Sequence, residues 1–292
     1  MEETPMELQP NPDSNVVISR KTIDIREVFR SKNPGLARLI PGFLYGYLKR
    51  IIHQNELNEF LYANRNVHGL EFVEAVIRYF NLKITVKGIE NVPPTGKVTV
   101  VSNHPLGGLD GLAIMHVLGK VRPDIITVVN DLLMFLPNLR PLFVPVNKHG
   151  KNSDYVKKLN ETFASENLMP IFPAGLCSRK QGDGTICDLE WKSTFVNQSV
   201  RNKRLIVPMH FKGRNSSFFH NLARLRKRLG IKANIEMLYL VDEMFKQHNN
   251  EVAITIGDPI EPDFFNKTKK PAEWAQWVKS HVYDLGSETN NT

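Results

Sequence analysis

The chain has 292 residues, of which 41% are hydrophobic and 23% are charged, a composition typical of a globular protein. Its two cysteines exclude a disulfide scaffold and indicate a reduced, cytoplasmic protein. The sequence contains no run of 18 apolar residues that would predict a membrane span, and its net charge of +8 favours anionic partners.

The N-terminal part of the chain is predicted to be a tail followed by helices. Residues 1–20 begin with an acidic, proline-containing stretch that lacks the apolar core of a secretory signal, so we predict a disordered tail. Residues 21–81 predict a helical region. In it, apolar residues recur at helical spacing from Leu36 to Ile52. Pro41 and Gly42 interrupt this pattern and predict two short helices at an angle.

From residue 82 onward, short β-branched segments alternate with helical ones. The predicted strands cover residues 82–88, 97–103, 126–130, 141–146, 168–175, 205–211, 234–240 and 252–259, and the predicted helices cover 109–119, 153–166, 217–229 and 271–284. Such alternation is typical of a mostly parallel sheet flanked by helices. We therefore predict one α/β domain over residues 82–292, with its boundary near residue 81.

The segment VSNHPLGGLDG (101–111) carries the strongest functional signal. His104 directly follows a predicted strand, and open α/β sheets bind ligands beyond the carboxyl ends of their strands. Gly107 and Gly108 permit a tight turn. Asp110 begins a predicted helix, where it can cap the helix and also orient the imidazole. The alternative is that Asp110 is only a helix cap and His104 only a loop residue.

The histidine and aspartate have no protein nucleophile beside them in the sequence. No GxSxG segment is present, so we expect His104 to act as a general base on a hydroxyl or amine of the substrate. Cys177, close to Arg179, could form an acyl-enzyme, but we favour direct attack and a packing role for this thiol. No metal-ligand spacing is found, so we expect no metal and no bound cofactor.

Four segments in order resemble the PlsC-like family of glycerolipid and lysophospholipid acyltransferases. They are NHPLGGLDG (103–111), PLFVPVNK (141–148), PIFPAGLCSRK (170–180) and LIVPMHFKG (205–213). The resemblance implies transfer of a fatty acyl group from a thioester, on coenzyme A or acyl carrier protein as co-substrate, to the hydroxyl of a lyso-lipid acceptor.

The departures from the family pattern bear on the acceptor. Five residues separate His104 from Asp110, where the family has four, and the two glycines could absorb the extra one. In the third segment, Ala174 and Cys177 replace a glutamate and an arginine, and in the family this segment helps to hold the acceptor's phosphate. A lyso-phospholipid remains our main prediction. An acylated amino acid, as in ornithine- or glycine-type lipids, is the alternative.

We assign the remaining site residues from these segments. Arg179 or Lys180 could supply the missing basic charge, Lys148 could bind phosphate, and the N–H groups near Gly175 and Leu176 could form an oxyanion site. Lys192 could contact a head group or simply begin a solvated helix. The predicted substrate-binding residues are Asn103, Gly107, Gly108, Lys148, Pro173, Gly175, Leu176, Arg179 and Lys180.

Two segments combine apolar residues at helical spacing with basic ones, 218–232 and 36–52. Both patterns suit a helix lying on an anionic membrane surface, although ordinary core helices could also show them. We expect a cytoplasmic protein bound peripherally to the inner face of the membrane. A nucleic-acid-binding α/β protein is the competing class, supported by the RLRKR cluster. The sequence lacks the known signatures of that class, so we expect no nucleic acid partner.

Overall fold

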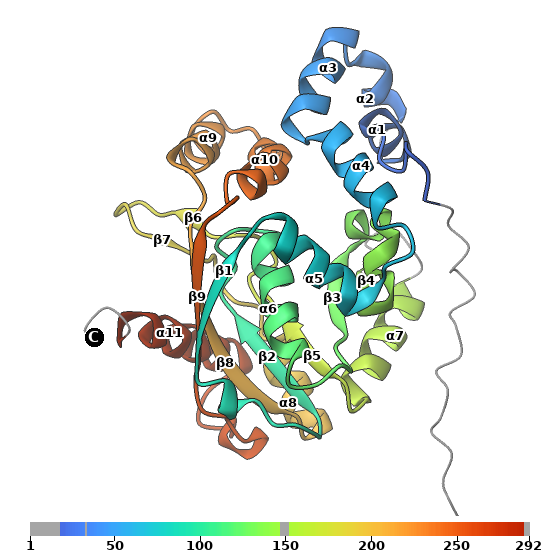
Figure 1. Ribbon diagram of the computed structural model, residues 1–292. Coiled ribbons are helices and arrows are strands. Elements are labelled where there is room, and N and C mark those ends of the chain that lie inside the picture. Colours follow the sequence, from blue (N-terminus) through green and yellow to red (C-terminus); the bar gives the residue numbers. More distant parts are fainter. Residues whose placement is uncertain (1–17, 33, 147–151, 289–292) are drawn as a thin grey trace, which may run out of the picture.

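A central five-stranded sheet organises the protein (Figure 1), which we describe from a computed structural model over residues 18–32, 34–146 and 152–288. The strands are β1 (Lys83–Lys87), β2 (Val98–Ser102), β5 (Leu168–Ile171), β8 (Leu205–Lys212) and β9 (Glu251–Ile256), in the order β1-β9-β8-β2-β5. Neighbouring strands are parallel except for β8 and β9. The predicted α/β fold with a mostly parallel sheet is confirmed.

Two small strand pairs extend this architecture. The strands β3 (Thr127–Asn130) and β4 (Phe143–Val146) pair in parallel, and a bridge from Ile125 to Leu168 joins this pair to the edge of the main sheet. The strands β6 (Arg179–Lys180) and β7 (Ile186–Cys187) form an antiparallel hairpin beyond β5.

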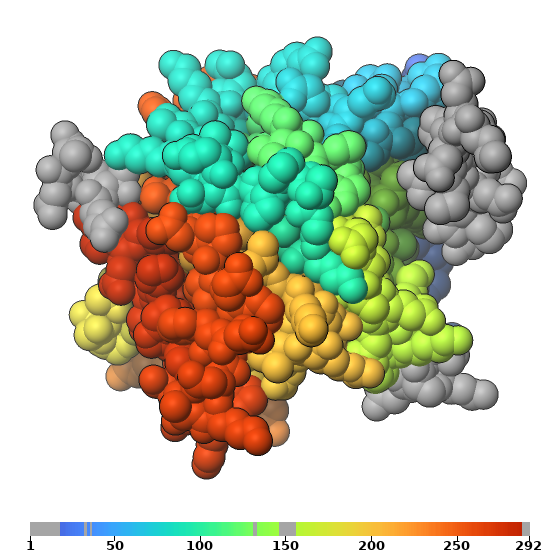
Figure 2. Space-filling model, turned by 90° about the horizontal axis from the view of Figure 1, so that it is seen from below, coloured from blue at the N-terminus to red at the C-terminus, as the bar shows by residue number. Residues whose placement is uncertain are grey.

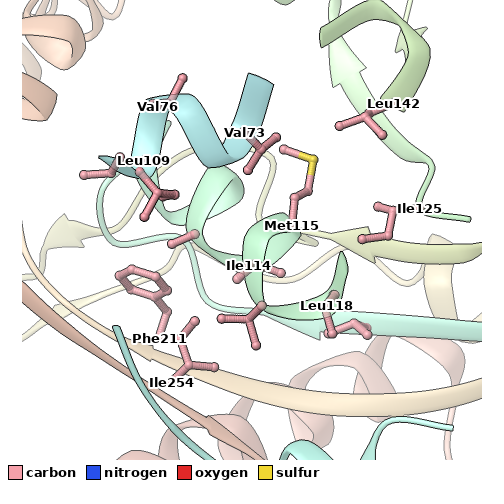
Figure 3. Close-up of a cluster of buried hydrophobic side chains, with 14 of the residues drawn as sticks. Val73, Val76, Leu109, Ile114, Met115, Leu118, Ile125, Leu142, Phe211 and Ile254 are labelled. Atoms are coloured by element: carbon pink, nitrogen blue, oxygen red, sulfur yellow. The ribbon is translucent and has the colours of Figure 1, made fainter. Parts of the chain in front are cut away.

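Successive strand residues point to opposite sides of the main sheet, so both faces carry apolar side chains. Helices cover both faces. On one face, α5 (Gly69–Tyr79) and α6 (Leu109–Gly119) pack onto the strands, and Figure 3 shows Val73, Ile114 and Phe211 in this core. On the other face, α8 (Thr194–Asn202) and α11 (Pro271–Glu288) form a second core. The helix α7 (Asn152–Ala164) lies between β4 and β5 in the chain.

The N-terminal helices are α1 (Ile25–Lys32), α2 (Pro34–Leu39), α3 (Gly42–Ile51) and α4 (Gln54–Ala63). The break predicted at Pro41 is confirmed, since α2 ends before this residue and α3 begins directly after it. Residues of α1 and α3 share a small apolar core with residues at and just before the start of α10 (Leu240–Phe245). The boundary at residue 81 remains a prediction, and residues 1–17 of the predicted tail lie outside the described residues.

One predicted strand is wrong. Residues 234–240 form the 3₁₀ turn η4 (Ile235–Tyr239) and the start of α10 (Leu240–Phe245), beside α9 (Ser217–Arg228). Glu236 explains the difference, because it is fully buried and pairs with Arg179 at 3.0 Å and Arg226 at 2.9 Å. A buried carboxylate needs such partners. The helical turn directs Glu236 toward both arginines while Leu238 and Tyr239 pack against the N-terminal helices.

The end of the molecule opposite the N-terminal helices is built from segments that connect the strands (Figure 1). Figure 2 shows this end from below, where the chain before β2 (teal), the segment around α8 (gold) and the segment around the 3₁₀ turn η5 (Pro262–Phe264, orange-red) pack side by side. Among the described residues, no helix is both long enough and apolar enough to cross a bilayer.

Arg204 is fully buried and connects the start of β2 with the segment between α7 and β5. Its guanidinium donates to the carbonyl oxygens of Val98 at 2.7 Å and Asn167 at 2.6 Å and to Thr99 Oγ1 at 3.0 Å. Two more carbonyl oxygens near the end of α7 accept from it. Burial lowers the pKa of Arg204 to about 10, so the group stays charged at neutral pH and its charge is met by these oxygens.

Replacing this arginine tests the interpretation. We expect Arg204→Met to lower the free energy of unfolding by about 2–4 kcal/mol, because buried carbonyl groups lose their donors. Arg201→Met, on the exposed side of α8, is the matched control and should change the value by less than about 0.5 kcal/mol. Urea denaturation followed by circular dichroism measures both, and equal losses in the two variants would contradict this role.

Candidate active site

The site begins where β2 ends and the chain leaves the sheet. Asn103 follows the strand, and its side chain pairs with the backbone of Phe211 on β8. Its amide donates to the carbonyl at 2.9 Å, and its oxygen accepts from the N–H at 2.7 Å. The side chain therefore continues the ladder in place of the backbone. We predicted a substrate contact for Asn103, but the structure commits both of its polar atoms to holding the strand end.

His104 and Asp110 are brought together as the spacing suggested. The Nδ1 atom of His104 lies 3.0 Å from Asp110 Oδ2. The same oxygen accepts from the backbone N–H groups of Leu106 at 2.8 Å and Gly107 at 3.1 Å. The Asp110 carboxylate thus closes the turn that carries the histidine and begins α6.

Gly107 adopts a backbone conformation in the spacer that favours glycine. Its φ of +83° lies in the left-handed region, and a Cβ atom there would lie 2.9 Å from Leu240 Cδ2 and 3.2 Å from Cys177 Cβ. Glycine is therefore required at this position for both conformation and space. Gly108 has open space where a Cβ would be and no positive φ.

The charge state of Asp110 determines which ring nitrogen of His104 carries the proton. Full burial raises the pKa of this carboxyl, but the charge and hydrogen bond of His104 and the two backbone N–H groups outweigh burial, so the pKa lies below its ordinary value. An ionised carboxylate can only accept, so Nδ1 must donate. In the neutral imidazole, Nε2 is then left as the proton acceptor.

The ring and main chain of His104 are held from further directions. Phe172, after β5, stacks on the imidazole with ring centroids 4.0 Å apart. The His104 N–H donates to Asp188 Oδ1 at 3.2 Å, and its carbonyl accepts from the Ser178 N–H at 2.7 Å. The side chain keeps 15% of its surface exposed, so the ring is fixed and still accessible.

Asp188 is a buried centre that sequence reasoning missed. Besides the His104 N–H, its carboxylate accepts from Ser178 Oγ at 2.6 Å and Trp191 Nε1 at 2.9 Å. Its own N–H donates to the Tyr283 hydroxyl of α11 at 2.8 Å. No motif marks this residue, because two of its partners, His104 and Tyr283, are more than 80 residues away in the sequence.

The third segment forms a turn under the imidazole. Gly175 has a φ of +68°, and its N–H donates to the Phe172 carbonyl at 3.0 Å. We predicted that this N–H could bind an oxyanion, but it is already engaged. The Leu176 N–H donates to no described group and stays a candidate. Pro173 is buried, and its carbonyl accepts from the Lys192 N–H at 3.1 Å.

Arg179, which we predicted to bind substrate, is engaged by other residues of the protein. Its guanidinium is buried, pairs with Glu236 at 3.0 Å and donates to the Cys177 carbonyl at 2.7 Å. Cys177 is fully buried, and burial raises the pKa of its thiol to about 11 despite the nearby arginine. A thiol protonated at neutral pH is a poor nucleophile, which supports the packing role that we favoured.

Lys180 and Lys148 are the remaining predicted basic residues. Lys180 lies half-buried on β6, in the hairpin beyond the turn, and Lys148 falls outside the described residues. His210 lies on β8 against Tyr283, and burial lowers its pKa to about 4, as expected for a packed, neutral histidine. Among the described residues, no group of three or more His, Cys, Asp or Glu side chains could hold a metal ion.

Comparisons with known proteins identify the family of this chain. Residues 27–290 match the family model described as Acyltransferase, so the chain belongs to this acyltransferase family and the predicted membership is confirmed. The chain is 51% identical over 265 residues to the lyso-glycine lipid O-acyltransferase of Phocaeicola vulgatus, covering 90% of this chain and 95% of that protein. It is 50% identical over 265 residues to the protein of the same name from Bacteroides thetaiotaomicron, covering 90% and 97%.

A solved structure is also similar. It is the 1-acyl-sn-glycerophosphate acyltransferase PlsC from Thermotoga maritima, with a TM-score of 0.46 and 15% sequence identity. The match covers 92% of this chain and 98% of that one.

The two adjacent glycines of the turn allow a matched test. We expect Gly107→Ala to lower the free energy of unfolding by about 1–3 kcal/mol, because a Cβ there is strained and meets packed side chains. Gly108→Ala should cost less than about 1 kcal/mol, since it meets open space. Thermal or urea unfolding of both variants measures the difference, and the reverse order of stability would rule out this account of the turn.

Proposed function

We propose that this protein transfers a fatty acyl group from an acyl-thioester to the hydroxyl of a lyso-glycine lipid, with His104 as the general base. The observation that carries the proposal is the 3.0 Å contact between His104 Nδ1 and the buried Asp110 carboxylate, in a chain of the acyltransferase family. The contact leaves Nε2 to take a proton from the incoming alcohol.

The reaction needs no protein nucleophile. His104 Nε2 removes the hydroxyl proton while the alcohol oxygen attacks the thioester carbonyl, and the ionised Asp110 stabilises the imidazolium that forms. The tetrahedral intermediate then collapses, the C–S bond breaks, and the imidazolium returns the proton to the leaving sulfur. The products are an ester and a free thiol. The Leu176 N–H, which donates to no described group, is our candidate for stabilising the oxyanion.

The acceptor is inferred from the relatives and from the altered third segment. Two proteins named lyso-glycine lipid O-acyltransferases are 51% and 50% identical to this chain, which favours the acylated amino acid over the lyso-phospholipid of our main prediction. Ala174 and Cys177 stand where the resembling family has glutamate and arginine, and Arg179 is held by Glu236. Glycine has no side-chain hydroxyl, so the accepting hydroxyl must lie on the amide-linked acyl chain.

The donor is a thioester of coenzyme A or of acyl carrier protein, and the chemistry at His104 is the same with either one. The leaving group is in each case the thiol of a phosphopantetheine arm. Our proposal therefore specifies the thioester and leaves both carriers as substrates to be tested.

A lipid substrate requires access to a membrane, and two predicted segments form one exposed surface. Phe43 on α3 is 81% exposed, and Leu229 after α9 is 64% exposed. Tyr239 connects α3 and α9, since its hydroxyl lies 2.7 Å from that of Tyr47 and its ring 5.0 Å from that of Phe218. We name this region the membrane surface. Its apolar residues are Leu39, Phe43, Leu44, Tyr47, Phe218, Leu225, Leu229 and Tyr239, and its basic residues are Arg38, Lys49, Arg50, Arg224, Lys227 and Arg228.

This membrane surface adjoins the active site. Leu240 follows Tyr239 directly and is the residue that a Cβ at Gly107 would meet. In Figure 1, α3 and α9 lie at the same end of the molecule as α10. Apolar side chains with basic neighbours suit an anionic lipid interface, where each basic residue contributes about 1 kcal/mol. We infer that the protein docks there peripherally, so that an acceptor can reach His104.

The base assignment has a direct kinetic test. We expect His104→Ala to lower kcat with an N-(β-hydroxyacyl)glycine acceptor by about 10²–10⁴-fold, because positioned base catalysis is lost, while the variant unfolds near the wild-type temperature. Acyl transfer is followed by mass spectrometry of the diacylated product. His116→Ala, in α6, is the control for removing a histidine outside the site. A folded His104→Ala variant with near-normal turnover would overturn the assignment.

Docking at the membrane surface can be tested separately from catalysis. We expect the double change Phe43→Ser and Phe218→Ser to weaken binding to anionic vesicles about tenfold, because two exposed apolar side chains no longer enter the interface. Val200→Ser, on the exposed face of α8, is the control and should bind as the wild type does. Vesicle flotation with and without anionic lipid gives the result, and equal binding by all three proteins would exclude this surface.

A further inference from the structure

Lys192 is a basic residue that the proposed reaction does not yet use, and its main chain is held against the active-site turn. Its N–H donates to the Pro173 carbonyl at 3.1 Å. The preceding Trp191 is buried, and its indole N–H donates to Asp188 at 2.9 Å. The same Asp188 carboxylate accepts from the His104 N–H. The backbone at Lys192 is therefore positioned by the residues that position the catalytic histidine.

The Lys192 ammonium lies over the glycine of that turn. Its Nζ is 3.5 Å from the place where a Cβ on Gly175 would be. The N–H of Gly175 donates to the Phe172 carbonyl, and the Phe172 ring stacks on His104 with centroids 4.0 Å apart. A positive charge thus stands on the same short turn whose aromatic residue covers the imidazole.

This charge has no acidic partner among the described residues, since none of their carboxylates lies within 4.0 Å of Lys192 Nζ. The side chain is exposed. Two other cations near the turn have partners, because Arg179 pairs with Glu236 and the Lys279 ammonium donates to the Asp188 carbonyl at 2.7 Å. Lys192 is therefore available for an anionic group of a substrate.

The chemistry of the acceptor supplies such a group. An N-acylglycine keeps a free carboxylate, separated from the chain hydroxyl by the amide and a few carbon atoms. We propose that Lys192 binds this carboxylate while the hydroxyl faces His104, and that it thereby selects an anionic amino-acid head group. The lysine ammonium is a compact point charge with three donors, so it can pair with a single carboxylate. This inference rests on the proposed function.

Paired acceptors separate a charge contact from a structural role. The acid is N-(β-hydroxyacyl)glycine, and its neutral counterpart is the corresponding glycinamide. We expect the wild type to prefer the acid. Lys192→Met should raise KM for the acid about tenfold, the effect of losing a charge-assisted hydrogen bond, with little change in kcat and none in KM for the amide. Lys192→Arg should restore most of the affinity.

The control is Lys203→Met. Lys203 is an exposed lysine that directly follows α8, whereas Lys192 precedes this helix, and the change should leave both KM values unchanged. Unchanged KM for the acid in Lys192→Met, or parallel increases for acid and amide, would overturn the carboxylate contact while leaving the proposed function intact. A wild type that acylates neither acceptor would overturn the proposed function and this inference with it.

Discussion

The buried Asp110 carboxylate is the group on which the site depends. A charge fully removed from water is tolerated only when donors surround it, and here three backbone N–H groups and the His104 imidazole do so. These bonds hold the turn at Leu106 and Gly107, the start of α6 at Gly111 and the orientation of the imidazole ring. The carboxylate therefore ties a structural requirement to the proton-accepting role of the histidine.

The surrounding structure transmits this constraint to the substrate-facing parts. Asp188 links the His104 main chain to the third segment and to α11, and Phe172 fixes the plane of the ring. On the other side, Leu240 packs where Gly107 leaves room and continues directly into Tyr239 of the membrane surface. The proposed membrane contact, acceptor binding and proton transfer thus involve neighbouring residues.

Local patterns predicted the local features well. The helix at 109–119 and the break at Pro41 follow from side-chain periodicity and proline geometry, and His104 and Asp110 were found because only six positions separate them. Side-chain partners distant in sequence were not predictable. Asn103 pairs with the backbone of Phe211, and Arg179 pairs with Glu236. Asp188 pairs with His104 and with Tyr283 of α11. The apolar run around Glu236 resembled a strand because nothing local reveals a buried ion pair.

The central claim is that Asp110 holds the proton of His104 on Nδ1 and leaves Nε2 as the acceptor. Nitrogen-15 NMR of protein labelled at histidine measures this tautomer directly, with His104→Ala identifying the signal. The account predicts that neutral His104 carries its proton on Nδ1, and that Asp110→Asn changes this preference. A neutral His104 protonated on Nε2 in the wild type would contradict the account.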